Sequence, residues 1–245
     1  MHPRTAQRLL THTDRYDLED VAIDQLAALL AALAAEPSPP TTVRDPADAV
    51  DVHIADSLSG LEIPVLRQAG RIADIGSGAG FPGLVLAAAL PAAHVDLIEA
   101  TARKCEVIAR LARAADLANA TAVPARAEEW AEGEAGRYDI VTARALASLP
   151  VLAEYAAPLL RVGGSLVAWK GARDAAEEEA GGRAAAALAL NPVAPVAVRP
   201  FKGSRERDLY VYTKAGPTPE RFPRRAGMAA KRPLGTWRSN RSPLN

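Results

Sequence analysis

The stretch that decides the predicted fold is Asp74-Ile75-Gly76-Ser77-Gly78-Ala79-Gly80-Phe81-Pro82-Gly83. It begins with the last two residues of a short apolar segment over 71–75, typical of a buried strand, and its end lies in a helix predicted over 81–90. Glycines permit positive φ angles and let a ligand lie against bare backbone. The free N–H groups at the start of a helix face such a ligand. The stretch therefore predicts a strand, a ligand-binding turn and a helix in succession.

Outward from this turn, strand and helix patterns alternate along the chain. Strands are predicted over 71–75, 94–98, 121–123, 138–142, 165–169, 193–198 and 208–213. Helices are predicted between them, over 81–90, 101–116, 127–131, 149–160 and 173–190. Such alternation is typical of a parallel sheet covered by helices on both faces. Because no long helix separates the last two strands, they predict an antiparallel hairpin at one edge. The expected fold is α/β, with a seven-stranded, mostly parallel sheet.

Three regions are expected along the chain. Residues 1–66 form a helical extension, with helices over 17–35 and 46–58 separated by the Pro-rich stretch 37–40. Residues 67–215 form the α/β domain. Residues 216–245 form a basic tail, which we expect to be loosely packed or to become ordered on contact, because Pro, Gly and Arg dominate it.

Composition excludes several classes of protein. The 245 residues include 49% hydrophobic and 24% charged side chains, as in an ordinary soluble protein, not a collagen-like or disordered chain. The single cysteine, Cys105, cannot form an internal disulfide; this fits a reducing cytoplasm, and we expect it to be a small buried side chain. No apolar run approaches the ~18 residues of a membrane span. The start, residues 1–4, does not resemble a signal peptide. A cytoplasmic protein with no membrane partner is expected.

The charges are distributed unevenly, although the chain holds 29 basic and 29 acidic residues. Residues 199–245 hold twelve basic and three acidic residues, a net charge of +9, so that the remainder carries −9. Such an asymmetry indicates an arm that binds nucleic acid. A solvated tail in an arginine-rich protein is the alternative interpretation.

Glu99 indicates an adenosine-containing cofactor, because it ends the second strand 23 residues after Gly76 and can accept hydrogen bonds from ribose hydroxyls. The spacing also matches the dinucleotide pattern G-x-G-x-x-G, so an NAD(P)-dependent oxidoreductase remains an alternative. Two observations favour S-adenosylmethionine. Asp74 directly precedes the turn, where it can help to order the methionine end, whereas a carboxylate beside pyrophosphate is unfavourable. No Tyr-x-x-x-Lys pair for hydride transfer follows.

Seven motifs together resemble one known family. They are His53–Leu58, Asp74–Gly83, Arg126–Glu129, Thr142–Leu149, Trp169–Gly171, Arg221–Gly227 and Lys231–Leu234. In this order they resemble the bacterial small-subunit ribosomal RNA guanine-N7 methyltransferases, also called glucose-inhibited division protein B. The resemblance runs from about residue 45 to residue 234. The family's Trp-Asn and Asn-Leu-Thr residues are missing from the stretch 38–43, so the chain departs from the family in the N-terminal part of the expected substrate surface.

The resemblance implies a Rossmann-like class I methyltransferase that uses S-adenosylmethionine to methylate N7 of a guanine in 16S rRNA, guanine 527 in the family. The partner is 16S rRNA or the small ribosomal subunit, and a monomer without a metal is expected. Together with the motif analysis, it assigns these residues to the cofactor: Gly76, Gly78, Phe81, Glu99, Ala127, Glu128 and Arg144. It assigns these residues of the basic tail to the RNA: Arg221, Arg224, Arg225, Lys231 and Arg232.

The chemistry of the target restricts the catalytic residues. Guanine N7 carries a lone pair and no proton, so direct in-line methyl transfer needs alignment and no general base. Arg144 is the catalytic candidate, either fixing the cofactor or a phosphate or facing guanine O6, with a surface arginine as the alternative. His53 and Asp56 lie three residues apart on one predicted helix; we favour a packing pair over a catalytic pair. A methyltransferase acting on a small molecule or a protein also remains open.

Overall fold

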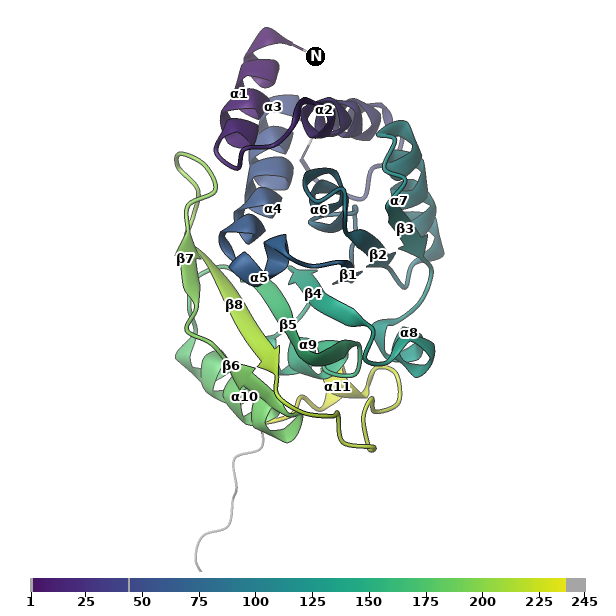
Figure 1. Cartoon of the computed structure of the whole chain (residues 1–245), viewed down its shortest axis with the longest axis vertical. Coiled ribbons are helices and arrows are strands. Elements are labelled where there is room, and N and C mark those ends of the chain that lie inside the picture. Colours follow the sequence, from purple (N-terminus) through teal and green to yellow (C-terminus); the bar gives the residue numbers. More distant parts are fainter. Residues whose placement is uncertain (1, 44, 237–245) are drawn as a thin grey trace, which may run out of the picture.

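The structure, a computed structural model, describes residues 2–43 and 45–236. Within them lies an eight-stranded sheet of order β3-β2-β1-β4-β5-β8-β6, with β7 also paired to β8 (Figure 1). The strands are β1 (Arg71–Ile75), β2 (His94–Ile98), β3 (Ala120–Val123), β4 (Tyr138–Arg144), β5 (Leu160–Lys170), β6 (Leu190–Pro192), β7 (Val196–Val198) and β8 (Arg207–Lys214). Strands β1 to β5 are parallel, and β8 runs antiparallel to β5. The predicted mixed sheet with an antiparallel edge is therefore confirmed.

Of the strand predicted over 193–198, only the second half forms, as β7. The unpredicted strand β6 precedes it, so the sheet has eight strands where seven were expected. β6 pairs with the end of β8 and β7 with its beginning. Between them Val193 N still donates to Val211 O at 2.8 Å. Pro195 has no N–H to donate, which interrupts the ladder at this edge.

Thirteen helical segments surround the sheet in the described residues. They are α1 (Pro3–Asp14), α2 (Asp20–Ala35), α3 (Pro46–Ala49), the π-helix η1 (Val50–Ala55), α4 (Asp56–Leu58), the 3₁₀-helix η2 (Ser59–Glu62), α5 (Pro64–Arg67), α6 (Gly83–Ala89), α7 (Ala102–Ala114), α8 (Ala127–Glu134), α9 (Leu149–Ala156), α10 (Ala175–Ala187) and α11 (Met228–Lys231). Helix α1 was not predicted, and the helix expected over 46–58 is a run of α, π and α segments.

Two hydrophobic cores cover the two faces of the sheet, because neighbouring residues of a strand point to opposite sides. Leu97 and Ile140 contribute to the core beneath α2, α6 and α7. The next residues, Ile98 and Val141, contribute to the core beneath α8, α9 and α10. Helices therefore lie on both faces, as predicted (Figure 1).

The described part of the basic tail is packed against the domain, so the loosely packed alternative is wrong for these residues. Phe222 is buried in the second core, and Ala229 of α11 is also buried. Arg224 Nε and Nη2 donate to the two carboxylate oxygens of Glu154 on α9 at 2.6 and 2.5 Å. Since Glu154 is itself buried, this ion pair attaches the tail firmly to α9.

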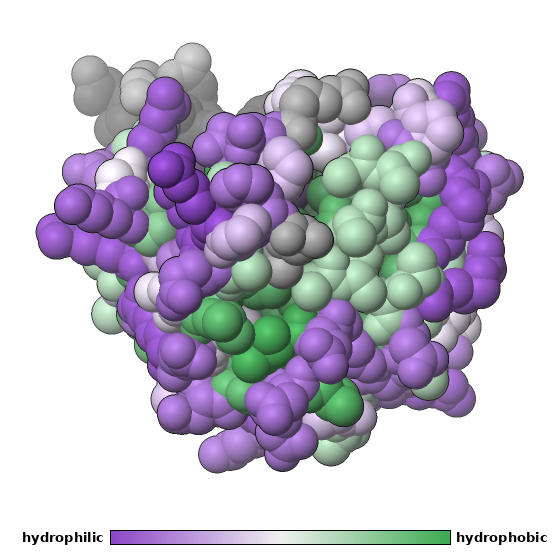
Figure 2. Space-filling view, turned by 90° about the horizontal axis from the view of Figure 1, so that it is seen from above, coloured by the Kyte–Doolittle hydropathy of each residue, from purple (hydrophilic) through white to green (hydrophobic). Residues whose placement is uncertain are grey.

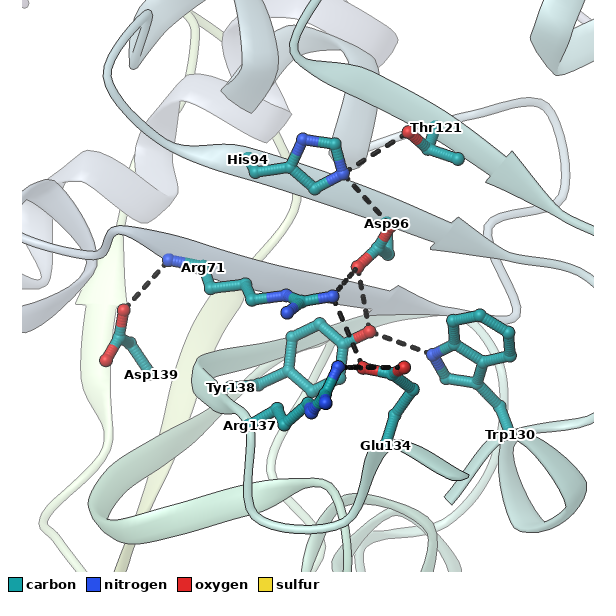
Figure 3. A network of polar contacts seen from close by, with 9 residues as sticks. All are labelled: Arg71, His94, Asp96, Thr121, Trp130, Glu134, Arg137, Tyr138 and Asp139. Carbon is teal, nitrogen blue, oxygen red and sulfur yellow. Dashed lines mark hydrogen bonds and ion pairs between the residues drawn. The ribbon is translucent and has the colours of Figure 1, made fainter. Parts of the chain in front are cut away.

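A polar network ties together the strands at the edge opposite the glycine-rich turn (Figure 3). Buried Asp96 accepts hydrogen bonds from the Tyr138 hydroxyl at 2.8 Å and from Arg71 Nη2 at 3.3 Å. Trp130 Nε1 in turn donates to the Tyr138 oxygen at 2.8 Å. Burial raises the pKa of Tyr138, which therefore remains a donor to Asp96. The network joins the beginnings of β1 and β4 to β2 and α8.

The N-terminal helices lie at one end of the molecule, seen from above in Figure 2 with apolar and polar areas side by side. Ala27, Ala31 and Ala34 of α2 line a shallow groove of about 370 Å³ beside α1 and Pro46. Among the described residues, no helix combines the length and apolar character needed to cross a membrane.

Candidate functional site

A cavity of about 440 Å³ opens at the carboxyl ends of β1, β2, β3 and β4, where parallel sheets usually bind ligands. Its walls come from the loops that follow these four strands, from the segment 40–41 and η1 of the helical extension, and from α9. All of the residues predicted to hold a cofactor line it, namely Gly76, Gly78, Phe81, Glu99, Ala127, Glu128 and Arg144. The fold thus brings together side chains from four separate loops.

The glycine-rich turn forms the floor of the cavity in a conformation that side chains disfavour. Gly76 and Gly78 have φ angles of +63° and +59°. A Cβ on Gly76 would lie 2.5 Å from the Leu146 side chain. A Cβ on Gly78 would meet only the Gly76 carbonyl oxygen at 3.8 Å and would otherwise occupy the cavity. The turn therefore offers bare backbone to a ligand, as the sequence predicts.

Glu99 is fixed by backbone donors on both sides of its carboxylate. Its Oε2 accepts from Gly78 N at 3.0 Å and its Oε1 from Thr101 N at 2.8 Å. Each carboxylate oxygen has a second lone pair that can accept a hydroxyl. The arrangement fits a ribose whose two hydroxyls face the end of β2.

Asp74 lies outside the lining of the cavity, so any ordering of the methionine end by this side chain acts through the turn and stays a prediction. Its Oδ2 accepts from Gly83 N at 3.1 Å, at the start of α6, and its Oδ1 from Thr142 Oγ1 at 2.8 Å, on β4. The side chain is fully buried, and burial raises its pKa to about 6. Asp74 joins β1 to its neighbours behind the glycine-rich turn.

Arg144 is held rigidly in the cavity wall. Its Nη1 donates to Val52 O at 2.9 Å and to Asp56 Oδ2 at 2.8 Å. Its Cζ lies 5.8 Å from the centroid of the Phe81 ring, within the range of a cation–π interaction. Only 13% of the side chain is exposed. The described hydrogen bonds leave Nε and Nη2 of the guanidinium as donors toward a ligand.

Asp56 pairs with two arginines and not with His53, so the expected packing pair does not form. Its Oδ1 accepts from Arg207 Nε at 2.8 Å, while its Oδ2 holds Arg144. The π-helix that contains His53 changes which side chains share a face, and residues three apart no longer meet across it. The carboxylate is 3% exposed and lies between the cavity and β8.

His53 closes one side of the cavity as a neutral ring. Its Nε2 lies 3.1 Å from Thr41 Oγ1, and it stacks on Phe81 with ring centroids 4.4 Å apart. Burial, followed by the nearby positive charge of Arg144, lowers the pKa of His53 to about 4. Thr41 belongs to the stretch 38–43 that departs from the family pattern, and it lines the cavity with Pro40.

Sequence reasoning missed several cavity residues, among them Thr41, Lys104, Leu146 and Tyr155. Leu146 lies within the motif 142–149, so the motif could have identified it as a cavity residue. Thr41 and Tyr155 carried no signal, because only the packing of the helical extension and of α9 brings them to the cavity.

The basic C-terminal segment reaches the wall of the same cavity at Glu128. Gly227 N donates to Glu128 Oε1 at 2.9 Å. Of the residues predicted to bind RNA, the exposed ones are Arg221, Arg225, Lys231 and Arg232. Arg224 is instead engaged with Glu154 and also donates to Arg232 O at 2.9 Å. The described residues hold no cluster of three or more His, Cys, Asp or Glu that could bind a metal ion.

Two solved structures show the same fold. A cofactor-bound structure of Rv0187 from MTB matches with a TM-score of 0.54 at 21% identity, covering 78% of this chain and 89% of that one. The S-adenosylmethionine-dependent methyltransferase SibL matches with a TM-score of 0.55 at 15% identity, covering 87% and 74%. The fold is that of the class I S-adenosylmethionine-dependent methyltransferases.

The family follows from sequence comparison. The family model for GidB, rRNA small subunit methyltransferase G, matches residues 24–206. The ribosomal RNA small subunit methyltransferase G of Rubrobacter xylanophilus is 45% identical over 196 residues, which cover 78% of this chain and 75% of the relative. That of Chloroflexus aggregans is 40% identical over 196 residues, covering 79% and 82%. The chain belongs to the GidB family of rRNA small subunit methyltransferases, which confirms the family resemblance.

Proposed function

We propose that this protein transfers a methyl group from S-adenosylmethionine to N7 of a guanine in the 16S rRNA of the small ribosomal subunit. The observation that carries the proposal is a rigid arginine, Arg144, in the wall of a cavity whose floor and far side fit an adenosine cofactor. The relatives' names supply the small-subunit rRNA, and the family resemblance supplies guanine 527. Membership of this family favours the methyltransferase over the oxidoreductase alternative.

The cofactor-binding residues each have a separate task. Glu99 accepts the ribose hydroxyls, the backbone of Gly76 and Gly78 approaches the methionine side, and Ala127 and Glu128 flank the adenine. When bound, S-adenosylmethionine supplies an electrophilic methyl group. The bare turn at Gly78 leaves room for it, since a side chain there would enter the cavity.

Arg144 orients the target guanine. Because N7 carries no proton, no side chain has to remove one, and alignment is the main requirement. With Nη1 committed to Val52 and Asp56, the remaining guanidinium donors can bind guanine O6, which lies beside N7 on the same edge of the base. His53, stacked on Phe81, excludes water from this side of the cavity.

The exposed basic residues of the C-terminal segment bind RNA phosphates. Arg221, Arg225, Lys231 and Arg232 supply the charge, and Arg224 attaches the segment to α9 through Glu154. The helical extension 1–66 completes the cavity through Thr41 and His53. The protein works as a cytoplasmic monomer on free 16S rRNA or on the small subunit.

The test is a methyl-transfer assay with small subunits or 16S rRNA that lack the modification. Wild-type protein is expected to form N7-methylguanine at one position, which borohydride and aniline cleavage of the RNA will map. Arg144→Ala is expected to reduce the rate by about 100-fold or more, an effect typical of losing one positioned electrostatic group. Glu99→Gln serves as a comparison that weakens S-adenosylmethionine binding in calorimetry.

Two outcomes would contradict the proposal. The absence of N7-methylguanine from RNA treated with wild-type protein would exclude the reaction. Full activity and cofactor affinity in Arg144→Ala would exclude the assigned role of this side chain. A parallel calorimetric titration with NADPH tests the oxidoreductase alternative, which requires that the protein bind NADPH.

A further inference from the structure

A second basic surface lies on the hairpin between β7 and β8, on the side of the molecule away from α8 (Figure 1). The hairpin, residues 199–207, contains four basic residues and one acidic residue. It lines a surface groove of about 1030 Å³ together with the end of α1 and residues 172–173 after β5. This groove is distinct from the cofactor cavity and from the basic segment 221–232.

Three cations of the groove are available to a ligand. Arg199, Lys202 and Arg205 are exposed, and none of them has an ion-pair partner among the described residues. Three other arginines of the groove are already engaged: Arg15 pairs with Glu62, Arg173 pairs with Glu178, and Arg207 pairs with Asp56. The positive charge of the groove is therefore concentrated on the hairpin loop.

The hairpin is fixed relative to the cofactor cavity. Arg15 Nη1 donates to Arg199 O at 2.8 Å and holds the first arm of the hairpin against α1. At its other end, Arg207 binds Oδ1 of Asp56 at 2.8 Å, while Oδ2 of the same buried carboxylate binds Arg144 in the cavity wall. A ligand that contacts both the groove and the cavity therefore meets them in one defined arrangement.

The two basic surfaces reach the cavity from different parts of the sheet: β8, which follows the hairpin, lies beyond β5, whereas Glu128 follows β3 at the other end of the strand order. The C-terminal segment joins the wall at Glu128, through Gly227 N, whereas the hairpin joins it at Asp56, beside Arg144. A single polyanion that crosses the cavity mouth would meet positive charge on both sides of the reacting nucleotide. RNA has this geometry, with a charged phosphate between each pair of successive nucleotides.

We propose that Arg199, Lys202 and Arg205 bind phosphates of the RNA strand on one side of the target guanine, while the segment 221–232 binds it on the other. The inference rests on the proposed RNA substrate and adds a second contact surface to it. An anionic lipid surface is disfavoured, because residues 199–207 carry no exposed large apolar side chain that could enter a membrane.

The test compares two full-length double variants with the same change in charge. Lys202→Gln with Arg205→Gln neutralises the loop of the hairpin. Arg4→Gln with Arg113→Gln neutralises two exposed arginines, on α1 and α7, that also lack ion-pair partners in the described part of the chain. Binding of unmodified 16S rRNA is measured over a range of salt concentrations, and S-adenosylmethionine binding is measured by calorimetry.

The hairpin variant is expected to bind the RNA about 10- to 50-fold more weakly at low salt, with a salt dependence shallower by ~0.7 for each lost phosphate contact. The control variant should stay within about twofold of wild type, because its charges lie outside the contact surface. Both variants should bind S-adenosylmethionine as wild type does. Arg207 is left unchanged because it contacts Asp56.

Two outcomes would overturn the inference: unchanged RNA affinity in the hairpin variant, or an equal loss of RNA affinity in both variants. The proposed function fails separately, if wild-type protein binds the RNA but forms no N7-methylguanine. If the wild type methylates the RNA and the hairpin variant binds it with wild-type affinity, the proposed function is retained and this contact surface is excluded.

Discussion

His53 should make the protein sensitive to mild acid in a way that its replacement removes. Burial and the charge of Arg144 lower its pKa to about 4, whereas an unfolded histidine titrates near ~6.5. Between these two values the unfolded chain binds more protons than the folded one. Stability therefore rises with pH through this window and is lost as the pH falls from about 6.5 toward about 4.

The magnitude follows from the two pKa values. Between about pH 7.5 and about pH 5, the linkage relation gives a loss of about 2 kcal/mol in the free energy of unfolding from His53 alone. Asp74 acts in the opposite direction, because burial raises its folded-state pKa to about 6. Lowering the pH over the same range therefore raises the free energy of unfolding by about 1 kcal/mol through Asp74. The free energy of unfolding of the wild type changes with pH by the sum of both effects. This sum is smaller than the contribution of His53 alone.

The assay is urea denaturation of wild type and of His53→Gln at both pH values. Glutamine retains a hydrogen-bonding group for Thr41 and does not titrate. The difference in unfolding free energy between the two proteins should change by about 2 kcal/mol between the two pH values, because every other titrating group cancels. In NMR titrations of the folded protein, the His53 ring should titrate well below pH 6.

A difference that stays constant within about 0.5 kcal/mol would refute the argument, because a buried neutral histidine must destabilise the folded state when it is protonated. An NMR midpoint near the ordinary histidine value would refute it as well. Either result would mean that the ring is solvated beside Phe81.

Two further predictions concern packing and the attachment of the C-terminal segment. Gly60→Ala should lower the free energy of unfolding by about 2–3 kcal/mol in urea titrations, because its Cβ would lie 2.4 Å from Trp169 Cζ2 in the core. Gly182→Ala is the matched control in α10, where nothing lies within 4 Å, and it should stabilise by about 0.5–1 kcal/mol; destabilisation by both would point to the backbone instead of the indole. Arg224→Gln should lower the free energy of unfolding by about 3–5 kcal/mol, because it leaves the Glu154 carboxylate, which is 1% exposed, without its partner. Glu154→Gln should lower it less, because the Arg224 side chain is 24% exposed and can reach water. The same denaturation experiment measures both, and the reverse order would contradict the prediction.

The sheet and the glycine-rich turn were predictable because their signals are local. Short apolar segments predict buried strands, and closely spaced glycines predict a turn with positive φ angles, as Gly76 and Gly78 have. The predictions that are wrong concern features that depend on contacts between residues far apart in the sequence. The Pro- and Arg-rich composition of the tail suggested loose packing, but Phe222 fits the second core and Arg224 meets a buried carboxylate on α9.

The cavity shows the same division between local and long-range information. Glu99 was predictable because a carboxylate at the end of the second strand has a fixed place relative to the turn. Thr41 was not, because its approach to His53 depends on how the helical extension packs over the sheet.

The sequence by itself determined the order of strands and helices, the ligand-binding turn and the uneven charge of the two parts of the chain. Only the tertiary structure decided the partners of Asp56. Arg144 and Arg207 lie 88 and 151 residues from it along the chain, and no spacing rule links them. A buried carboxylate must be paired wherever the fold places it. Its pairing with two arginines therefore depends on which elements pack around it, and this packing joins the cavity to the basic hairpin.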